Sequence, residues 1–232
     1  MLIAITGGIG SGKSVVSQLL RVLGYTVYDC DVRAKWVMTH DPLLRQQLID
    51  LFGPDTYMAP KGEFKNNERF ERFESTNPQT PQTPQTPQTL PTLNKPYLSS
   101  RIFSDPTALA QMNACVHPAV QRDLQRQYEA SYPHNLKTSK PHDLFFFESA
   151  ILFESGFDLL SHPDLVWTVS APLELRISRA MQRDHTTREQ VLARIHSQLD
   201  QEEKERRSDS IIYNDDAHSL IEQVSRLIAN TF

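Results

Sequence analysis

The chain has 232 residues, of which 39% are hydrophobic and 22% charged, an ordinary soluble composition large enough for one sizeable core. The formal net charge of −4 excludes a general electrostatic attraction to nucleic acid, so any anion site must be local. The apolar stretch at residues 144–157 is interrupted by Glu148 and Glu154, which excludes a membrane span there.

Neither the start of the chain nor its cysteines indicate an exported protein. Met1 leads directly into an apolar run, without the basic region and cleavage site of a signal peptide. Cys30 and Cys115 lie far apart, and the eight histidines form no grouping typical of zinc ligands. We therefore expect a cytoplasmic protein with reduced cysteines, no structural zinc and no membrane partner.

The first element is a strand followed by a glycine-rich loop and a helix. Leu2–Ile5 favours a strand, Gly7–Ser14 matches G-x-x-x-x-G-K-[ST], and apolar residues at helical spacing follow from Val15 to Leu23. Glycines let main-chain N–H groups approach a phosphate, and the new helix directs its N-terminus at the same anion. Lys13 is expected to reach the β- and γ-phosphates, and the Ser14 hydroxyl a Mg²⁺ ion.

Residues 26–31 alternate as a second strand, which makes a βαβ unit with parallel strands. Asp31 falls at the carboxyl end of this strand, the edge at which open α/β sheets bind ligands. The alternative is that Asp31 caps a helix over residues 32–38. Asp29 has the same two interpretations.

A helix is predicted over Pro42–Phe52 and ends at Gly53-Pro54. Residues 65–94 form an insertion whose segment 77–89 repeats Pro, Gln and Thr with period three, so an extended surface loop is expected. The tract is either a tolerated insertion or a docking segment for a partner that recognises proline.

Helical segments are predicted to resume after the insertion. They cover residues 106–112 and 119–132, the second opened by His117-Pro118, and a polar turn follows at 133–142. Leu144–Phe147 then indicates a strand buried on both faces, and it ends in Glu148. Glu148 resembles the acidic residue that helps to hold Mg²⁺ in P-loop enzymes, or it is a capping or ion-paired carboxylate.

The last third of the chain contains two more strands, at residues 165–169 and 210–214, and a final helix at 218–228. Between the strands, Pro172 begins a polar helical region rich in arginine. Most of these arginines suit a solvated helix face, whereas a mobile lid would bring arginines to a phosphate as it closes. The arginines are Arg176, Arg179, Arg183, Arg188 and Arg194.

Taken in order, four blocks resemble the dephospho-CoA kinase family. They are TGGIGSGKS at 6–14, VYDCDVRAK at 27–35, RIFSD, HPAV and ILFESGFD between 101 and 158, and RAMQRD, RIHSQ and IIYND between 179 and 215. The chain departs from the family at three places. Val15 stands where the family usually has Thr, and Lys35 where it usually has Arg. Glu148-Ser149-Ala150 replaces a segment that in the family usually contains an aspartate and a proline. No family counterpart is placed for the Pro-Gln-Thr tract.

The resemblance implies transfer of the ATP γ-phosphate to the ribose 3′-hydroxyl of dephospho-CoA. It implies a three-layer α/β P-loop fold with a parallel sheet, whose core is residues 1–31, 143–172 and 208–232. A helical acceptor-binding part would span 32–142 and a helical lid 173–207, in a monomer or weak homo-oligomer. The alternatives are another small-molecule kinase of nucleotide or shikimate type, or a P-loop switch protein, although no N-K-x-D guanine reader is present.

Carried over by position, the resemblance implies that Asp31 accepts the hydroxyl proton while Lys13 and the lid residue Arg183 stabilise phosphate charge. The expected ATP contacts are Gly8, Gly10, Ser11, Gly12, Lys13, Ser14, Val15 and Asn214. The expected acceptor contacts are Asp31, Lys35, Arg101 and His117. Ser14 is the expected metal ligand.

Overall fold

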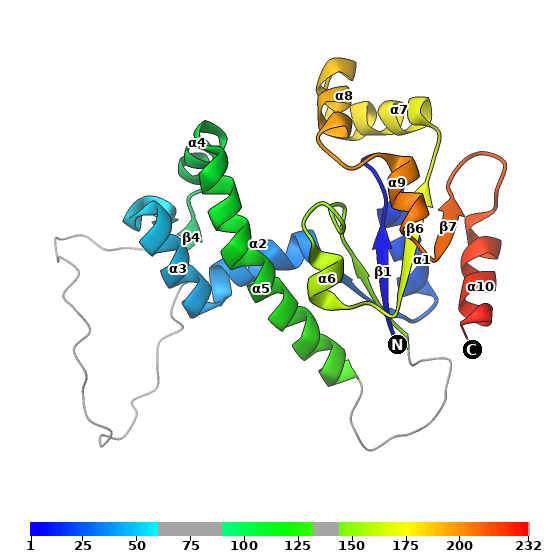
Figure 1. The fold of residues 1–232 in the computed structure, drawn as a ribbon, viewed down its shortest axis with the longest axis horizontal. Coiled ribbons are helices and arrows are strands. Elements are labelled where there is room, and N and C mark those ends of the chain that lie inside the picture. Colours follow the sequence, from blue (N-terminus) through cyan, green and yellow to red (C-terminus); the bar gives the residue numbers. More distant parts are fainter. Residues whose placement is uncertain (60–89, 132–143, 232) are drawn as a thin grey trace. The chain divides into compact units, whose positions relative to one another are not determined.

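The computed structural model describes residues 1–59, 90–131 and 144–231, which fall into two compact units (Figure 1). The first unit comprises residues 1–37 and 113–232, and the second comprises residues 38–112. Within the described ranges, no helix has the length and apolarity needed to cross a bilayer. The division into core, acceptor-binding part and lid stays a proposal.

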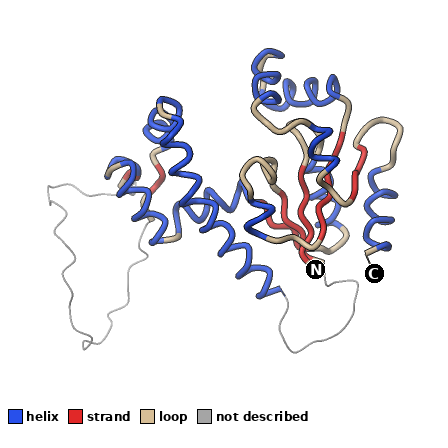
Figure 2. The backbone as a smooth tube through the Cα atoms, in the orientation of Figure 1, coloured by secondary structure: helices blue, strands red, loops and turns tan. Residues whose placement is uncertain are grey.

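The first unit is built on a sheet of five parallel strands (Figure 2). Its spatial order is β2-β5-β1-β6-β7, so the strand that carries the glycine-rich loop lies at the centre. The strands are β1 (Leu2–Thr6), β2 (Thr26–Asp29), β5 (Phe145–Glu148), β6 (Leu165–Ser170) and β7 (Ser210–Tyr213). The helices in this unit, two of them shared with the second, are α1 (Lys13–Val22), α2 (Cys30–His40), α5 (Pro106–Ser131), α6 (Phe157–Ser161), α7 (Leu173–Asp184), α8 (Arg188–His196), α9 (Gln201–Arg206) and α10 (Leu220–Asn230).

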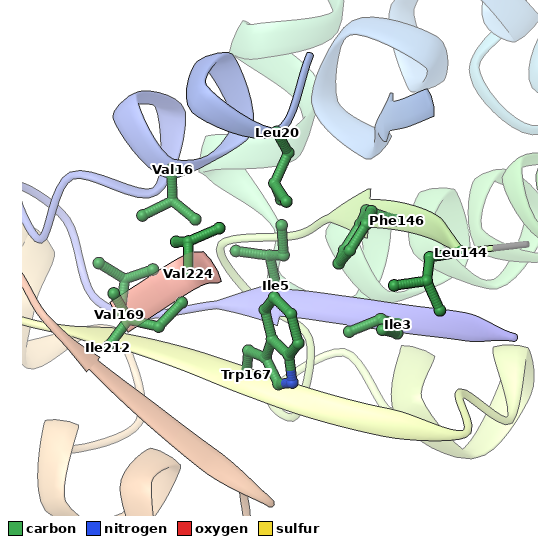
Figure 3. Packing of buried hydrophobic residues seen from close by; sticks show 10 residues of the cluster. All are labelled: Ile3, Ile5, Val16, Leu20, Leu144, Phe146, Trp167, Val169, Ile212 and Val224. Carbon is green, nitrogen blue, oxygen red and sulfur yellow. The ribbon is translucent and has the colours of Figure 1, made fainter. Parts of the chain in front are cut away.

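Alternate residues of each strand point to opposite faces of the sheet, and the central strands are buried along their length. Helices therefore cover both faces. On one face, α1 and α10 pack against a core that Figure 3 shows from close by. This cluster is Ile3, Ile5, Val16, Leu20, Leu144, Phe146, Trp167, Val169, Ile212 and Val224. On the other face, Tyr128 of α5 contacts Phe145, and Phe157 of α6 contacts Phe147. The predicted three-layer α/β fold with a parallel sheet is therefore confirmed.

The second unit is mainly helical. It contains α3 (Pro42–Phe52), a short 3₁₀ turn (Pro54–Thr56), the antiparallel pair β3 (Tyr57–Met58) and β4 (Thr92–Leu93), and α4 (Lys95–Ser104). The helix predicted over Pro42–Phe52 is confirmed at both ends. Asp41 caps it by accepting from the main-chain N–H groups of Leu43 and Leu44, and Gly53 ends it.

Three expectations need correction. The second strand ends at Asp29, and residues 30–31 already belong to α2. The helices predicted at 106–112 and 119–132 are one 26-residue helix, α5, with Pro118 inside it. A proline costs a helix one hydrogen bond, but burial of Val120 and Leu124 favours continuation. Residues 92–93 of the predicted loop pair with β3, whereas its 77–89 segment and the turn at 133–142 lie outside the described residues.

Candidate active site

A cleft of about 420 Å³ lies at the carboxyl ends of the central strands of the first unit. Its lining residues come from the glycine-rich loop, α1, the first turn of α2, the end of β5 and the segment after β6. They are Ile9, Gly10, Gly12, Lys13, Ser14, Val15, Asp31, Glu148, Ala150, Arg179, Ala180, Arg183 and Gln198. This is the edge of the sheet at which ligands of open α/β folds bind.

Lys13 lies at the first position of α1, where the loop becomes helix. Its Nζ donates to the carbonyls of Gly7 at 2.8 Å and Gly8 at 3.2 Å, so the loop wraps around the ammonium group. Burial lowers the pKa of Lys13 from 10.5 to about 8, although the negative charge of Glu148 opposes the shift. A phosphate entering the cleft would meet this amine beside the N-terminus of α1, where the helix dipole favours an anion.

Gly12 is one of the loop positions at which a glycine is required. Its φ is 95°, in the left-handed region, and a Cβ there would lie 1.8 Å from Nδ2 of Asn214. Asn214 is buried and donates its Nδ2 to the Ser11 carbonyl at 2.8 Å. Asn214, the residue directly after β7, therefore holds the glycine-rich loop in place just before α1 begins.

Three carboxyl groups gather near the exits of β2 and β5. Asp31 lines the cleft from the first turn of α2, while Asp29 accepts from the main-chain N–H of Val32 at 2.9 Å and so caps that helix. The residue that caps α2 is therefore Asp29, and the capping interpretation of Asp31 is wrong. Burial and the charge of Asp29 raise the pKa of Asp31, and Lys13 and Lys35 oppose the rise.

Glu148 lines the same cleft at the end of β5, between β2 and β1. Ser17 of α1 donates its hydroxyl to Oε2 of Glu148 at 2.6 Å. Burial raises the pKa of Glu148, whereas the Ser17 hydrogen bond and the charge of Lys13 lower it. Glu148 is therefore a hydrogen-bonded carboxylate beside Lys13 and caps no helix.

Two arginines of α7 reach the cleft. Arg183 lines it, but its guanidinium is held at 2.7 and 3.0 Å by the carboxylate of Asp184, which also accepts from Arg194 at 2.7 Å. These two arginines lower the pKa of Asp184 to about 2. Arg179 donates Nη1 to the carbonyl of Asn214 at 3.0 Å. Asp184 occupies two of the five N–H groups of the Arg183 guanidinium, so a phosphate would either replace this carboxylate or bind through the remaining donors.

The cleft brings together several of the predicted site residues: Gly10, Gly12, Lys13, Ser14, Val15, Asp31 and Arg183. Gly8, Ser11 and Asn214 support the loop and do not line the cleft. Lys35 lies one helical turn after Asp31 on α2, and His117 packs edge-on against Phe157. Arg101 belongs to α4 of the second unit, where its guanidinium lies over the Tyr97 ring.

Ile9, Arg179 and Gln198 also line the cleft. From the sequence, Arg179 was named only among the candidate lid arginines and Gln198 only within the family block RIHSQ, and neither was given a contact. Arg179 had a signal, because it lies four residues before Arg183 on one helix and shares its face. Gln198 had only its place in the family block RIHSQ, because an uncharged side chain after α8 gives no local pattern. Its proximity to the loop arises only from tertiary packing.

Comparisons with known proteins agree with this geometry. A family model described as dephospho-CoA kinase matches residues 1–75 and 84–219, and the gap between the two matches overlaps the first part of the Pro-Gln-Thr tract. A dephospho-CoA kinase of Bacteroides fragilis is 38% identical over 227 residues, covering 98% of this chain and 91% of that protein. One from Porphyromonas gingivalis is 37% identical, covering 97% and 92%.

Solved structures support the same fold. A crystal structure of a Thermus thermophilus protein aligns with a TM-score of 0.71 and 29% identity, covering all of this chain and 97% of that one. A dephospho-CoA kinase of Campylobacter jejuni aligns with a TM-score of 0.58 over 99% and 96%, and at 22% identity it supports the fold alone.

Proposed function

Because this chain belongs to the dephospho-CoA kinase family, we propose that it transfers the γ-phosphoryl group of ATP to the ribose 3′-hydroxyl of dephospho-CoA. The products are CoA and ADP. The observation that carries the proposal is the cleft in which the Asp31 carboxylate shares the lining with Lys13 and Ser14. A phosphate donor and a hydroxyl acceptor that meet there would have cations on one side and a proton acceptor on the other.

Asp31 is proposed to orient the 3′-hydroxyl and to accept its proton as the oxygen attacks phosphorus. Its raised pKa favours this role, because a carboxylate with a higher pKa is a stronger base. Lys13 is proposed to stabilise charge on the β- and γ-phosphate oxygens, and Arg183 to join it after leaving Asp184. The transfer is in line, and positioning and electrostatics supply most of the rate.

The residues of the cleft fit a Mg²⁺ ion bound together with ATP. Within the described ranges no group of three or more His, Cys, Asp or Glu side chains is arranged to hold a metal. A P-loop site needs none, because Mg²⁺ keeps several waters and takes its other ligands from phosphates. Ser14 is proposed as its protein ligand, with Glu148 holding its waters; the ion would neutralise phosphate charge.

Lys35, Arg101 and His117 stay proposals for acceptor binding, as does Asn214 for the adenine side. Burial lowers the pKa of His117, which favours the neutral ring at physiological pH. A neutral histidine would contact the acceptor through hydrogen bonding or packing. The cytoplasmic location, the monomeric or weakly associating state and the absence of a nucleic-acid partner stay predictions.

The test is the substitution Asp31→Asn, which keeps the shape of the side chain and removes its basicity. Loss of a general base is expected to lower kcat about 10²- to 10⁴-fold, with the KM for ATP changed by less than about threefold. Asp29→Asn is the matched control, because Asn also caps helices, and it is expected to keep most of the turnover. Near-normal kcat in Asp31→Asn would refute the role of base.

A further inference from the structure

The first residues of the glycine-rich loop are held by side chains that come from far along the chain. The main-chain N–H of Ile9 donates to Oε1 of Gln198 at 2.9 Å, and that of Gly8 donates to Oε1 of Gln201 at 3.1 Å. Arg176 of α7 completes the set by donating its Nε to the Ile9 carbonyl at 3.0 Å. All three side chains belong to the arginine-rich segment that follows β6.

These contacts satisfy backbone groups that have no partner within the loop. A buried N–H without an acceptor costs free energy comparable to a lost hydrogen bond, so each glutamine stabilises one conformation of the loop. Arg176 is also the reason for a small residue at position 8, because a Cβ on Gly8 would lie 2.1 Å from its Nη2. Gly8, a residue predicted to contact phosphate, is therefore also required by the close approach of Arg176.

Gln201 and the segment between the two glutamines are themselves held by further contacts. Gln201 donates its amide to Glu205 at 3.1 Å and to the carbonyl of Val169 at 3.4 Å. In the segment between Gln198 and Gln201, the main-chain N–H of Leu199 donates to Glu154 at 2.9 Å. Glu154 in turn pairs with the fully buried Lys204 at 2.6 Å. The junction between α8 and α9 is thus held by a hydrogen bond and an ion pair with Glu154, and its glutamines contact the start of the loop.

We propose that Gln198 and Gln201 are positioning residues for the nucleotide. They hold Gly8 and Ile9 so that the N–H groups at the start of α1 remain directed at the phosphates. The proposal rests on the proposed function only in that the ligand is a nucleoside di- or triphosphate. The segment that follows β6 carries both the two glutamines and the arginines of α7, so the glutamines also link these arginines to the loop.

The experiment compares Gln198→Met and Gln201→Met, which keep the side-chain length and remove the acceptor oxygen. Gln182→Met is the matched control, since Gln182 is exposed on α7 and does not contact the loop. Calorimetry gives the Kd for Mg-ATP and for Mg-ADP without an acceptor. Amide exchange of the peptide that contains residues 8–10 reports the loop, and thermal unfolding reports the fold.

Each loop variant is expected to bind both nucleotides roughly five- to tenfold more weakly, because a change of that size corresponds to the loss of one hydrogen bond. Amide exchange at residues 8–10 accelerates in parallel, while the Tm falls by no more than about 4 °C and the control stays as in the wild type. Unchanged nucleotide Kd in both variants overturns the proposal. So does weaker binding without faster exchange, which would mean that Gln198 contacts the nucleotide directly.

The same calorimetry with dephospho-CoA in the absence of nucleotide separates this inference from the proposed function. The Kd for dephospho-CoA is expected to be unchanged in both loop variants, since the loop faces the phosphates. If the wild type binds no dephospho-CoA, the proposed function fails, and the nucleotide Kd values still decide the inference. If nucleotide and dephospho-CoA affinity fall together with the Tm in both variants, the role is merely structural and the proposal is overturned.

Discussion

Binding of Mg-ATP is expected to take up a proton at alkaline pH, because Lys13 has a lowered pKa in the free protein. Burial brings that pKa to about 8. At a pH near 8.5, about three quarters of the free protein then holds Lys13 as the neutral amine. The β- and γ-phosphates would place negative charge beside Nζ and raise its pKa toward the ordinary value. Binding at that pH should therefore take up about 0.7 proton, against about 0.1 near pH 7.

The sign of the pH dependence follows from the same shift. Since the bound complex holds the proton more tightly, nucleotide affinity is fully present below the pKa of free Lys13 and is lost as the pH rises above it. With a bound pKa near 10.5, the Kd for Mg-ATP should weaken roughly 30-fold between pH 7 and about 9.5.

The assay is calorimetry at one pH in two buffers that differ in ionisation enthalpy, which gives the number of protons taken up. Lys13→Arg is the control, because arginine stays charged throughout and should show almost no uptake. Uptake below about 0.2 proton near pH 8.5 would contradict the reasoning. Equal uptake in wild type and Lys13→Arg would assign the proton to another group.

Three further substitutions test separate contacts. Gly12→Ala should lower the free energy of unfolding in urea by about 2 kcal/mol, because a Cβ there meets Asn214 in a left-handed backbone; a loss below about 0.5 kcal/mol would contradict the packing. Lys204→Met should cost about 3–5 kcal/mol by leaving Glu154 without its cation, and adding Glu154→Gln should recover part of it. Arg183→Met should lower kcat/KM for ATP about a hundredfold, whereas Arg188→Met, which removes an exposed pair with Glu174, should not; equal effects would refute the role of Arg183.

Local sequence was sufficient for the elements whose signals are local. The glycine-rich motif lies between a strand and a helix as expected, and Pro42–Phe52 carries its own cap and stop. The continuous apolar run before Glu148 predicted a strand buried on both faces, which lies next to β1 in the sheet. These features depend on residues within a few positions of one another.

Sequence reasoning failed where tertiary contacts decide. Strand alternation extended the second strand to Asp31, but Asp29 caps α2 two residues earlier. Pro118 looked like a helix start, yet packing carries α5 through it. The support of Gly8 and Ile9 by Gln201 and Gln198 joins residues 193 and 189 positions apart, for which one sequence has no pattern.

The central claim is that this chain phosphorylates dephospho-CoA, and the direct measurement is ADP release from Mg-ATP with a panel of acceptors. The panel holds dephospho-CoA, adenosine, AMP, shikimate and a blank, and the product is identified by mass and by chromatography against CoA. We predict strong stimulation by dephospho-CoA alone, with CoA formed in equal amount to ADP. Stimulation by another acceptor, or ATP loss that ignores every acceptor, would contradict the account.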